Sequence, residues 1–240
     1  LCDIDDIGQE GLELAFDNVL RGVPGKKRVM RDGKKNVIAD IEEISSPIPG
    51  RDLQISIDSR LQYLAYRELK AAVKSHKASS GSLVMLDAKT GEVLAVVNQP
   101  SFNPNDRGDL QGYRYRNRAM TDVFEPGSTV KPFLIASALD GGYVSANDVV
   151  DTSPGYYRIG RNVVRDFRNY GVLGLTDILK KSSNVAVSKI ANEMPAEAMW
   201  GFYNRLGMGQ SAGVGFPGEA SGTLIDYQYM DDFEQATLSF

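Results

Sequence analysis

The sequence predicts an α+β protein in which helices cover an antiparallel hairpin of apolar strands. Two apolar runs, residues 81–87 and 92–97, are joined by a turn that ends in glycine, a pattern typical of a central β-hairpin. A helix that begins at Asp58 or Ser59 carries a single apolar stripe, which indicates that it packs on a sheet. A second run with apolar residues at helical spacing follows Gly127. These features together predict a layered domain.

The composition is that of a globular protein and excludes several classes. The chain has 240 residues, of which 42% are hydrophobic, enough for one large domain or a domain with an appendage. Its 27 basic and 31 acidic residues are interspersed and leave a net charge of -4, so we expect no nucleic-acid partner. A single cysteine, Cys2, allows no disulfide framework or cysteine metal site within the chain. We expect no metal and no cofactor.

The first fifty residues predict a short helix and a β-hairpin. Residues 9–20 have apolar side chains at mostly helical spacing, and a run of glycine and proline stops them. Two strand-like runs, 28–31 and 36–39, flank a polar turn. Two prolines within residues 45–50 indicate a linker. We therefore place a domain boundary there, with one part over 1–50 and a second over 51–240.

Two further segments surround the central hairpin. Leu53, Ile55 and Ile57 alternate with polar residues, which predicts a half-buried strand before the helix that starts at Asp58 or Ser59. Residues 98–122 are rich in proline and arginine, and we expect a loop.

The part of the chain beyond residue 142 predicts short elements. Residues 151–166 read as a polar loop with a weak hairpin around Gly160, and residues 175–180 as a short helix capped by Thr176. Further helices are expected over 185–191 and from Pro195, and a glycine-rich loop over 207–222.

Ser128 and Lys131 form a pair that suits nucleophilic catalysis. Residues three apart on a helix share a face, so the lysine amine can reach the serine hydroxyl, and Gly127 lets a substrate backbone approach closely. A serine hydroxyl needs a base during attack, and lysine serves only when neutral. Lowering the lysine pKa from about 10.4 to roughly 7 to 8 needs burial near other cations. The pair therefore predicts an enclosed cleft, in which the helix N-terminus suits an oxyanion.

The alternative interpretation is that Ser128 caps a helix and Lys131 is a solvated side chain. Two observations favour catalysis. The S-x-x-K spacing occurs once in the chain, and His76 is the only histidine. A Ser-His-Asp triad would have to use His76, which ends a charged, lysine-flanked helix where a solvated role is expected.

The motifs of the second half resemble a known superfamily. STVK at residues 128–131, followed by SSN at 182–184, resembles the first two active-site motifs of penicillin-binding proteins and serine β-lactamases. The flanking runs RNRA (116–119), TDVFEPG (121–127) and KSSNV (181–185) look like the class B penicillin-binding proteins of cell division. The GQEG run near residue 10 is similar to the family's segment between the pedestal and transpeptidase domains.

This resemblance implies a fold and a role for each matched residue. The fold is an antiparallel sheet sandwiched by helices, with part of an N-terminal pedestal over residues 1–50. Ser128 would be the acylated nucleophile and Lys131 its base. Ser182 would relay a proton to the leaving amine, which a hydroxyl beside an amine can do, and Asn184 would contact a substrate amide. A cap and turn remain the alternative for Ser182 and Asn184.

The family's third motif, a Lys-Ser/Thr-Gly strand, has no counterpart after Asn184. KTG at residues 89–91 spells it but lies in the hairpin turn, and SAN at 145–147 is better explained as a cap before Asp148. We expect that the chain is an excised segment whose sheet is incomplete at the C-terminal side, and that it is inactive by itself.

The resemblance implies a peptidoglycan D,D-transpeptidase that cross-links septal peptidoglycan and is a target of β-lactams. Its partners would be D-Ala-D-Ala stem peptides and membrane proteins of the division machinery, including a septal glycosyltransferase. Its catalytic domain would lie on the periplasmic face of the inner membrane. Other possibilities are a serine β-lactamase or D,D-carboxypeptidase, which the pedestal disfavours, and a non-catalytic division scaffold or a β-lactam sensor.

Overall fold

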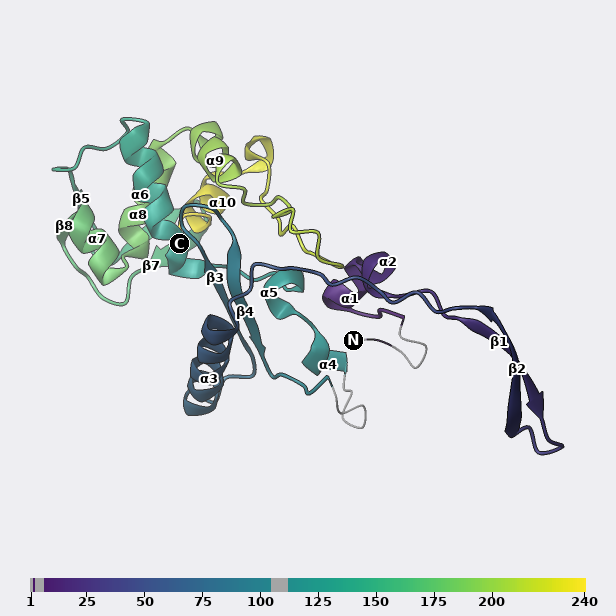
Figure 1. Ribbon diagram of the computed structural model, residues 1–240. Helices are drawn as coiled ribbons and strands as arrows, with labels where there is room; N and C mark the ends of the chain where they lie inside the picture. The colour runs from purple at the N-terminus through teal and green to yellow at the C-terminus, as the bar shows by residue number, and fades with distance from the viewer. Residues whose placement is uncertain (1, 3–6, 105–111) are drawn as a thin grey trace. The chain divides into compact units, whose positions relative to one another are not determined.

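The computed structural model describes residues 2, 7–104 and 112–240 (Figure 1). The chain forms two compact units. The first contains residues 1–122 together with 213–220, and the second contains residues 123–212 together with 221–240. Within the described residues the strands pair as four two-stranded antiparallel sheets, and helices occur in both units. The predicted mixture of helices and antiparallel strands is therefore confirmed.

The first unit begins with two short helices and a long hairpin. The predicted helix over 9–20 is divided into α1 (Gly11–Ala15) and α2 (Asp17–Leu20), because Phe16 between them has φ -117° and ψ 23°. The predicted hairpin is present as β1 (Lys26–Arg31) and β2 (Val37–Ser45). Its polar turn is closed by the Asp32 carboxylate, which accepts the backbone N–H groups of residues 34 and 36 at 2.8 Å.

The central hairpin and its covering helix also agree with the sequence pattern. Strands β3 (Gly81–Leu86) and β4 (Val93–Gln99) pair, and α3 (Ser59–Ser75) packs against them. Asp58 caps α3 by accepting the N–H groups of its first turn at 2.9 and 3.2 Å. Ala65 on the helix and Ala95 and Val97 on β4 are the buried centre of this packing.

The strand expected over Leu53–Ile57 is wrong, because this segment has irregular backbone. It nevertheless follows the outer edge of β4. The Ser56 hydroxyl donates to the carbonyl of Val93 at 2.7 Å, and the Asp58 N–H donates to that of Leu94 at 3.0 Å. Further along, the Gln62 carboxamide bonds both backbone groups of Val96, at 2.7 and 2.8 Å. Side chains thus satisfy edge groups that a strand would otherwise pair.

The rest of the first unit contains two single-turn helices, α4 (Gly112–Tyr115) and α5 (Arg118–Thr121), in the region expected to be loop. Part of that expected loop, 105–111, lies outside the described residues. The KTG sequence at 89–91 is the turn between β3 and β4, where Gly91 has φ +77° and the Asp87 carboxylate accepts two backbone N–H groups. Its interpretation as a turn is confirmed.

The second unit is built of helices with two small two-stranded sheets. The 3₁₀ turn η2 (Gly127–Val130) leads into α6 (Lys131–Asp140), and α7 (Leu175–Lys181), α8 (Asn184–Glu193) and α9 (Ala196–Arg205) follow. Strand β5 (Val149–Asp151) pairs with β8 (Val172–Gly174), and β6 (Tyr156–Ile159) pairs with β7 (Asn162–Arg165). The unit ends with η3 (Tyr227–Tyr229) and α10 (Asp232–Thr237).

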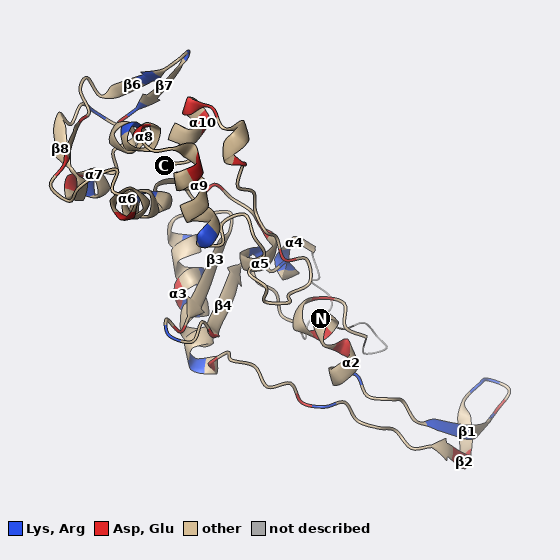
Figure 2. Ribbon diagram, turned by 90° about the horizontal axis from the view of Figure 1, so that it is seen from above, with Lys and Arg blue, Asp and Glu red and all other residues tan. Residues whose placement is uncertain are grey.

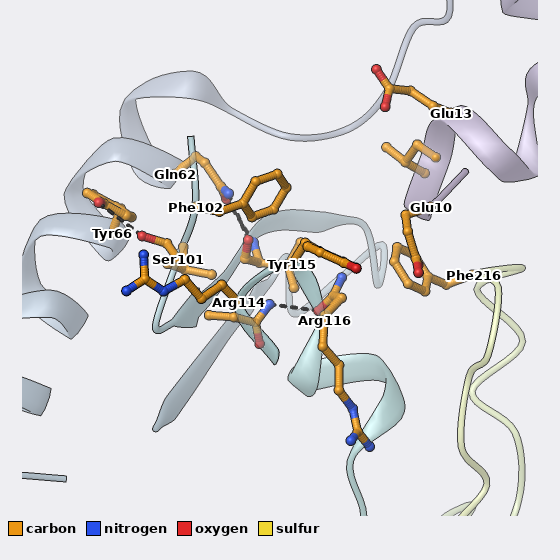
Figure 3. Close-up of a pocket in the computed structure, with 16 residues that line it drawn as sticks. Glu10, Glu13, Gln62, Tyr66, Ser101, Phe102, Arg114, Tyr115, Arg116 and Phe216 are labelled. Carbon is orange, nitrogen blue, oxygen red and sulfur yellow. Dashed lines mark hydrogen bonds between the residues drawn. The ribbon is translucent and has the colours of Figure 1, made fainter. Parts of the chain in front are cut away.

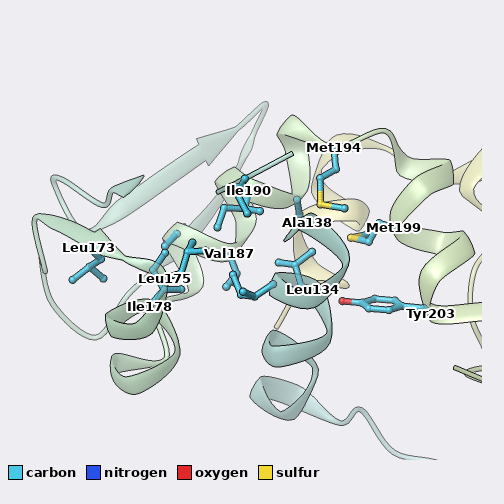
Figure 4. Packing of buried hydrophobic residues seen from close by; sticks show 14 residues of the cluster. Leu134, Ala138, Leu173, Leu175, Ile178, Val187, Ile190, Met194, Met199 and Tyr203 are labelled. Carbon is cyan, nitrogen blue, oxygen red and sulfur yellow. The ribbon is translucent and has the colours of Figure 1, made fainter. Parts of the chain in front are cut away.

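One apolar core joins α6, α7, α8 and α9 in this unit (Figure 4). Leu134 and Ala138 of α6 are completely buried in it, and the aromatic ring of Tyr203 from α9 lies against the same cluster. Burial in this cluster raises the pKa of the Tyr203 hydroxyl. The core fixes α6 relative to α8. Lys131 lies on α6 and Asn184 on α8, while Ser128 lies in η2 and Ser182 follows the last residue of α7.

Two features of the second unit differ from the sequence expectation. Thr176 does not cap α7, because it is the second residue of the helix and Gly174 occupies the N-cap position without a side-chain bond. Helix α10 was not predicted, although Asp231 and Glu234 form a capping box at its start. Among the described residues, no helix has the length and apolar character needed to span a bilayer.

Candidate active site

The nucleophile candidate lies in a tight turn at the start of α6. Gly127 has φ +60°, and the Thr129 hydroxyl donates to the carbonyl of Pro126 at 2.7 Å, which closes the 3₁₀ turn. Ser128 is exposed on this turn, whereas Lys131 is 1% exposed. The sequence thus places an accessible hydroxyl one turn from a buried amine.

The Lys131 amine is surrounded by oxygen atoms from two segments of the chain. Its Nζ lies 3.0 Å from Ser128 Oγ and 2.9 Å from Ser182 Oγ, and the two hydroxyl oxygens are themselves 3.0 Å apart. The carbonyl oxygen of Ser182 lies at 2.7 Å and Oδ1 of Asn184 at 2.6 Å. One amine and two serine hydroxyls therefore form a closed triangle of hydrogen bonds.

Two of these four oxygens restrict where the amine hydrogens can point. A carbonyl oxygen and a carboxamide oxygen only accept, so Ser182 O and Asn184 Oδ1 each take one N–H from Lys131. A neutral amine has two hydrogens and one lone pair. With both hydrogens engaged, its lone pair faces the serine hydroxyls, the orientation needed to accept the proton of Ser128.

Ser182 is held in an unusual backbone conformation at the end of α7. It has φ +55° and ψ +46°, the left-handed region that glycine usually occupies after a helix. A non-glycine residue there costs on the order of 1 to 2 kcal/mol. This conformation directs both the carbonyl and the hydroxyl of Ser182 toward Lys131. Strain of this kind is characteristic of functional sites.

Asn184, the first residue of α8, is oriented by contacts on both sides of its carboxamide. Its Oδ1 accepts from Lys131 at 2.6 Å, and its Nδ2 donates to the carbonyl of Arg165 at 3.4 Å. Reversing the amide would place two donors together at Lys131 and two acceptors together at Arg165. The contacts therefore fix which end of the carboxamide faces the amine.

Burial controls the protonation of Lys131. It lowers the pKa of the amine to about 8, while the negative charge of Asp166 acts in the opposite direction. From the sequence we expected burial together with neighbouring cations. Burial is present, but the charge that acts on this pKa among the described residues is the anionic Asp166, not a cation. The Phe240 ring, whose centroid is 5.8 Å from Nζ, covers the amine further.

The structure brings together Ser128, Lys131, Ser182 and Asn184, the four residues that the sequence analysis selected. His76 ends α3 in the first unit and is exposed. The SAN sequence at 145–147 lies in a surface turn, where the backbone N–H of Ser145 donates to Asp148. Asp166 belongs to the site but was missed, because its partners follow it by 17 and 19 residues and no local pattern relates them.

A separate cavity of about 550 Å³ lies within the first unit (Figure 3). It is lined by α3, β4 and the α4 region, and Tyr66 and Ser101 share a hydrogen bond of 3.2 Å on its wall. Arg116 in its lining is already paired with Asp122 at 2.7 Å. None of the four residues around Lys131 lines this cavity.

The fold and the site define a class of protein. Residues 81–240 match the penicillin-binding protein transpeptidase domain, and residues 3–55 match the penicillin-binding protein dimerisation domain. The first match covers two thirds of the chain, and the chain belongs to the penicillin-binding protein transpeptidase family.

Within this family, the chain is similar in sequence to proteins named as peptidoglycan D,D-transpeptidases. The chain is 45% identical over 240 residues to a probable peptidoglycan D,D-transpeptidase PenA of Neisseria flavescens, covering 99% of this chain and 60% of the relative. It is 47% identical over 238 residues to the peptidoglycan D,D-transpeptidase FtsI of Escherichia coli K12, covering 99% of this chain and 40% of that protein. The chain thus spans about half the length of the curated relatives it matches.

Solved structures agree with this assignment. A peptidoglycan glycosyltransferase crystal structure from Burkholderia ambifaria is similar with a TM-score of 0.70 and 43% identity, over 78% of this chain and 55% of that one. The transpeptidase domain of Burkholderia pseudomallei penicillin-binding protein 3 gives a TM-score of 0.69 and 41% identity, over 80% and 53%. The expected penicillin-binding transpeptidase fold is confirmed.

Proposed function

We propose that the protein containing this chain is a peptidoglycan D,D-transpeptidase that acts through an acyl-Ser128 intermediate. The observation that carries the proposal is the position of the Lys131 amine, buried and within 3.0 Å of both the Ser128 and Ser182 hydroxyls. A solvated surface lysine would have neither the burial nor the four oxygen contacts. The names of the relatives support the same reaction.

In the proposed acylation step, neutral Lys131 takes the proton of Ser128 while Ser128 Oγ attacks the carbonyl carbon of the amide that joins the two D-alanines. The tetrahedral intermediate then collapses, and the C–N bond breaks. The leaving amine of the terminal D-Ala needs a proton, which Ser182 can deliver because its hydroxyl touches both Lys131 and Ser128. Free D-Ala leaves, and the stem remains as an ester on Ser128.

The second step transfers the acyl group to an amine of a neighbouring stem. The incoming amine attacks the ester carbonyl and loses a proton through the Ser182 and Lys131 pair, and Ser128 Oγ departs and regains a proton. The bond formed is the cross-linking amide. Asn184 would contact the substrate backbone with its Nδ2, which has only a 3.4 Å bond to Arg165.

The proposed activity also implies a substrate, an inhibitor class and a cellular location. We infer action on septal peptidoglycan, inhibition by β-lactams, and a position on the periplasmic face of the inner membrane among division proteins that include a septal glycosyltransferase. The relatives' names and the similarity to class B penicillin-binding proteins support this. We also propose that residues 1–50 form part of a pedestal and residues 51–240 part of a transpeptidase domain.

The test uses the full-length protein with a stem pentapeptide ending in D-Ala-D-Ala and an acceptor stem bearing a free amine. We expect D-Ala to be released in step with a cross-linked product identified by mass spectrometry. Release of D-Ala with water as the acceptor would indicate a carboxypeptidase. Slow acylation by penicillin without any D-Ala release would indicate a sensor and contradict the proposal.

A further inference from the structure

We propose that Asp166 is a positioning residue of this site: it holds the turn that bears Ser182 and Asn184, and its negative charge acts on the Lys131 amine. The proposal rests on the function inferred above. It concerns a residue that lies outside the Ser-x-x-Lys and Ser-x-Asn motifs, in the loop after β7.

The Asp166 carboxylate ties this loop to the beginning of α8. Its Oδ2 accepts the Ser183 hydroxyl at 2.6 Å, and its Oδ1 accepts the backbone N–H of Val185 at 3.0 Å. Ser183, which is completely buried, uses the same hydroxyl oxygen to accept the N–H of Ala186 at 3.0 Å. Two of the unpaired N–H groups in the first turn of α8 are thus satisfied through Asp166 and Ser183.

The bonds made by Ser183 lie between the two residues of this turn that contact the Lys131 amine, Ser182 and Asn184. Ser183 lies between Ser182 and Asn184, so anchoring its side chain fixes the backbone on both sides. Ser182 remains in its left-handed conformation only if the surrounding structure holds it there. We infer that the Asp166 to Ser183 bond is one of the contacts that keep the carbonyl and hydroxyl of Ser182 directed at Lys131.

Asp166 is itself held by the backbone of a neighbouring turn. Its N–H donates to the carbonyl of Gly155 at 3.0 Å, and Gly155 has φ +95°. A Cβ at residue 155 would lie 2.9 Å from the backbone nitrogen of Asn169, so only glycine fits this approach without movement. The loop that carries Asp166 is therefore fixed from both sides.

The negative charge of Asp166 raises the pKa of Lys131, whereas burial lowers it. Other charged groups lie on the elements packed around this region: Asp140, Asp151, Arg158, Arg165, Arg168, Asp177, Lys180, Lys181, Lys189, Glu193, Glu197, Arg205, Asp232 and Glu234. Figure 2 shows basic positions, coloured blue, on the ribbon of the β6–β7 hairpin. Arg165 and Lys181 lie against the rings of Tyr156 and Tyr170. Asp166 is the one charge among the described residues that shifts the pKa of Lys131.

Two substitutions separate the contacts of Asp166 from its charge. Asp166→Ala removes both. Asp166→Asn removes the charge but can keep both contacts, because its Oδ1 still accepts from Val185 and its Nδ2 can donate to the Ser183 oxygen. The second contact is then reversed, since in the native site the Ser183 hydroxyl is the donor. Asp177→Asn is the matched control, since Asp177 is an exposed carboxylate on α7 of the same unit and, within the described part of the chain, makes no hydrogen bond to the site.

The experiment measures the rate of acylation of the full-length protein by a fluorescent penicillin between pH 6 and 10. We expect Asp166→Ala to be acylated about 10- to 100-fold more slowly, the scale for misplaced catalytic groups. We expect Asp166→Asn to reach half-maximal rate at a lower pH than wild type, because a lysine without a neighbouring anion loses its proton more easily. Asp177→Asn should match wild type in both respects.

Two results would overturn the inference: an Asp166→Asn midpoint equal to that of wild type, or Asp166→Ala acylated at the rate of the Asp177→Asn control. Thermal melting identifies a variant that does not fold. If Asp166→Ala is such a variant, the pH midpoint of Asp166→Asn decides alone. Absence of labelling at Ser128 in the wild-type protein would instead contradict the proposed function, so the two failures are distinguishable.

Discussion

Ser128 Oγ and Lys131 Nζ lie 3.0 Å apart, and one end of this pair is exposed while the other is buried. The difference follows from a single turn of chain. The 3₁₀ turn over 127–130 presents the hydroxyl to solvent, and the first turn of α6 carries the amine into the interior beside α8. In the proposed mechanism, substrate can therefore reach the Ser128 hydroxyl while the Lys131 amine remains desolvated.

Replacing the base by a permanently charged group should stop the reaction. Lys131→Arg is expected to be acylated by penicillin at least about 1000-fold more slowly, because a guanidinium does not deprotonate near neutral pH and its planar fork does not fit the four oxygens around Nζ. The measurement is the second-order acylation rate of the full-length protein. Lys180→Arg, at an exposed site on α7, is the control and should be unaffected. Equal rates for both variants would remove Lys131 from the role of base.

The pH dependence of acylation should report the buried lysine. Burial lowers the pKa of Lys131 to about 8, so the amine is mainly protonated below pH 8 and mainly neutral above it. Since only the neutral form accepts a proton, the rate should rise with pH through about 8 and fall about tenfold for each unit below pH 7. A rate that is constant between pH 6 and 9 would show that deprotonation of Lys131 does not limit acylation.

Two substitutions at Ser182 separate the effect of its strained backbone on stability from the effect of its hydroxyl on acylation. Ser182→Ala and Ser182→Gly both remove the hydroxyl, and both should slow acylation by about 10- to 1000-fold. Their stabilities should differ, because glycine adopts φ +55° without strain and alanine does not. We expect the glycine variant to be more stable than the alanine variant by about 1 kcal/mol in chemical denaturation. A glycine variant that is less stable than alanine would mean that the left-handed conformation costs nothing here.

Gly155 should affect stability, because its backbone approaches Asn169 closely and its carbonyl accepts the Asp166 N–H. Gly155→Ala places a Cβ 2.9 Å from the Asn169 nitrogen at φ +95°, and we expect a loss of about 1 to 3 kcal/mol in the free energy of unfolding. Gly160→Ala is the control, because its φ is +57° and no atom of the described residues lies within 4 Å of the added carbon. That variant should lose about 1 kcal/mol. Equal losses would show that the close approach at Asn169 is easily relieved.

The part of the site that is local in sequence could be predicted. Ser128 and Lys131 are three residues apart, and helical geometry alone places them on one face. Ser182 and Asn184 were found only through their resemblance to a known motif, because no periodicity relates residues 128 and 182. Asp166 was not found at all. Its role arises where the loop after β7 meets the first turn of α8, and its sequence neighbours Arg165 and Phe167 give no indication of it.

In the fold, too, the elements set by neighbouring residues could be predicted, and pairings between distant segments could not. Apolar stripes and turn residues predicted α3, the β3–β4 hairpin and the β1–β2 hairpin. The alternation of Leu53, Ile55 and Ile57 predicted a strand, but side chains and one N–H supply the edge bonds that a strand would make. For α10 the signal was local, since Asp231 and Glu234 have capping-box spacing. The short β5–β8 pairing joins segments too far apart for any local pattern.

The most direct measurement of the central claim is the site of covalent labelling by penicillin in the full-length protein. After labelling and digestion, mass spectrometry should find the penicilloyl group on the peptide that contains Ser128. Ser128→Ala should abolish labelling while leaving the thermal melting temperature unchanged, and Ser145→Ala, at an exposed serine of the same unit, should label like wild type. Labelling that persists in Ser128→Ala at another serine would contradict the account.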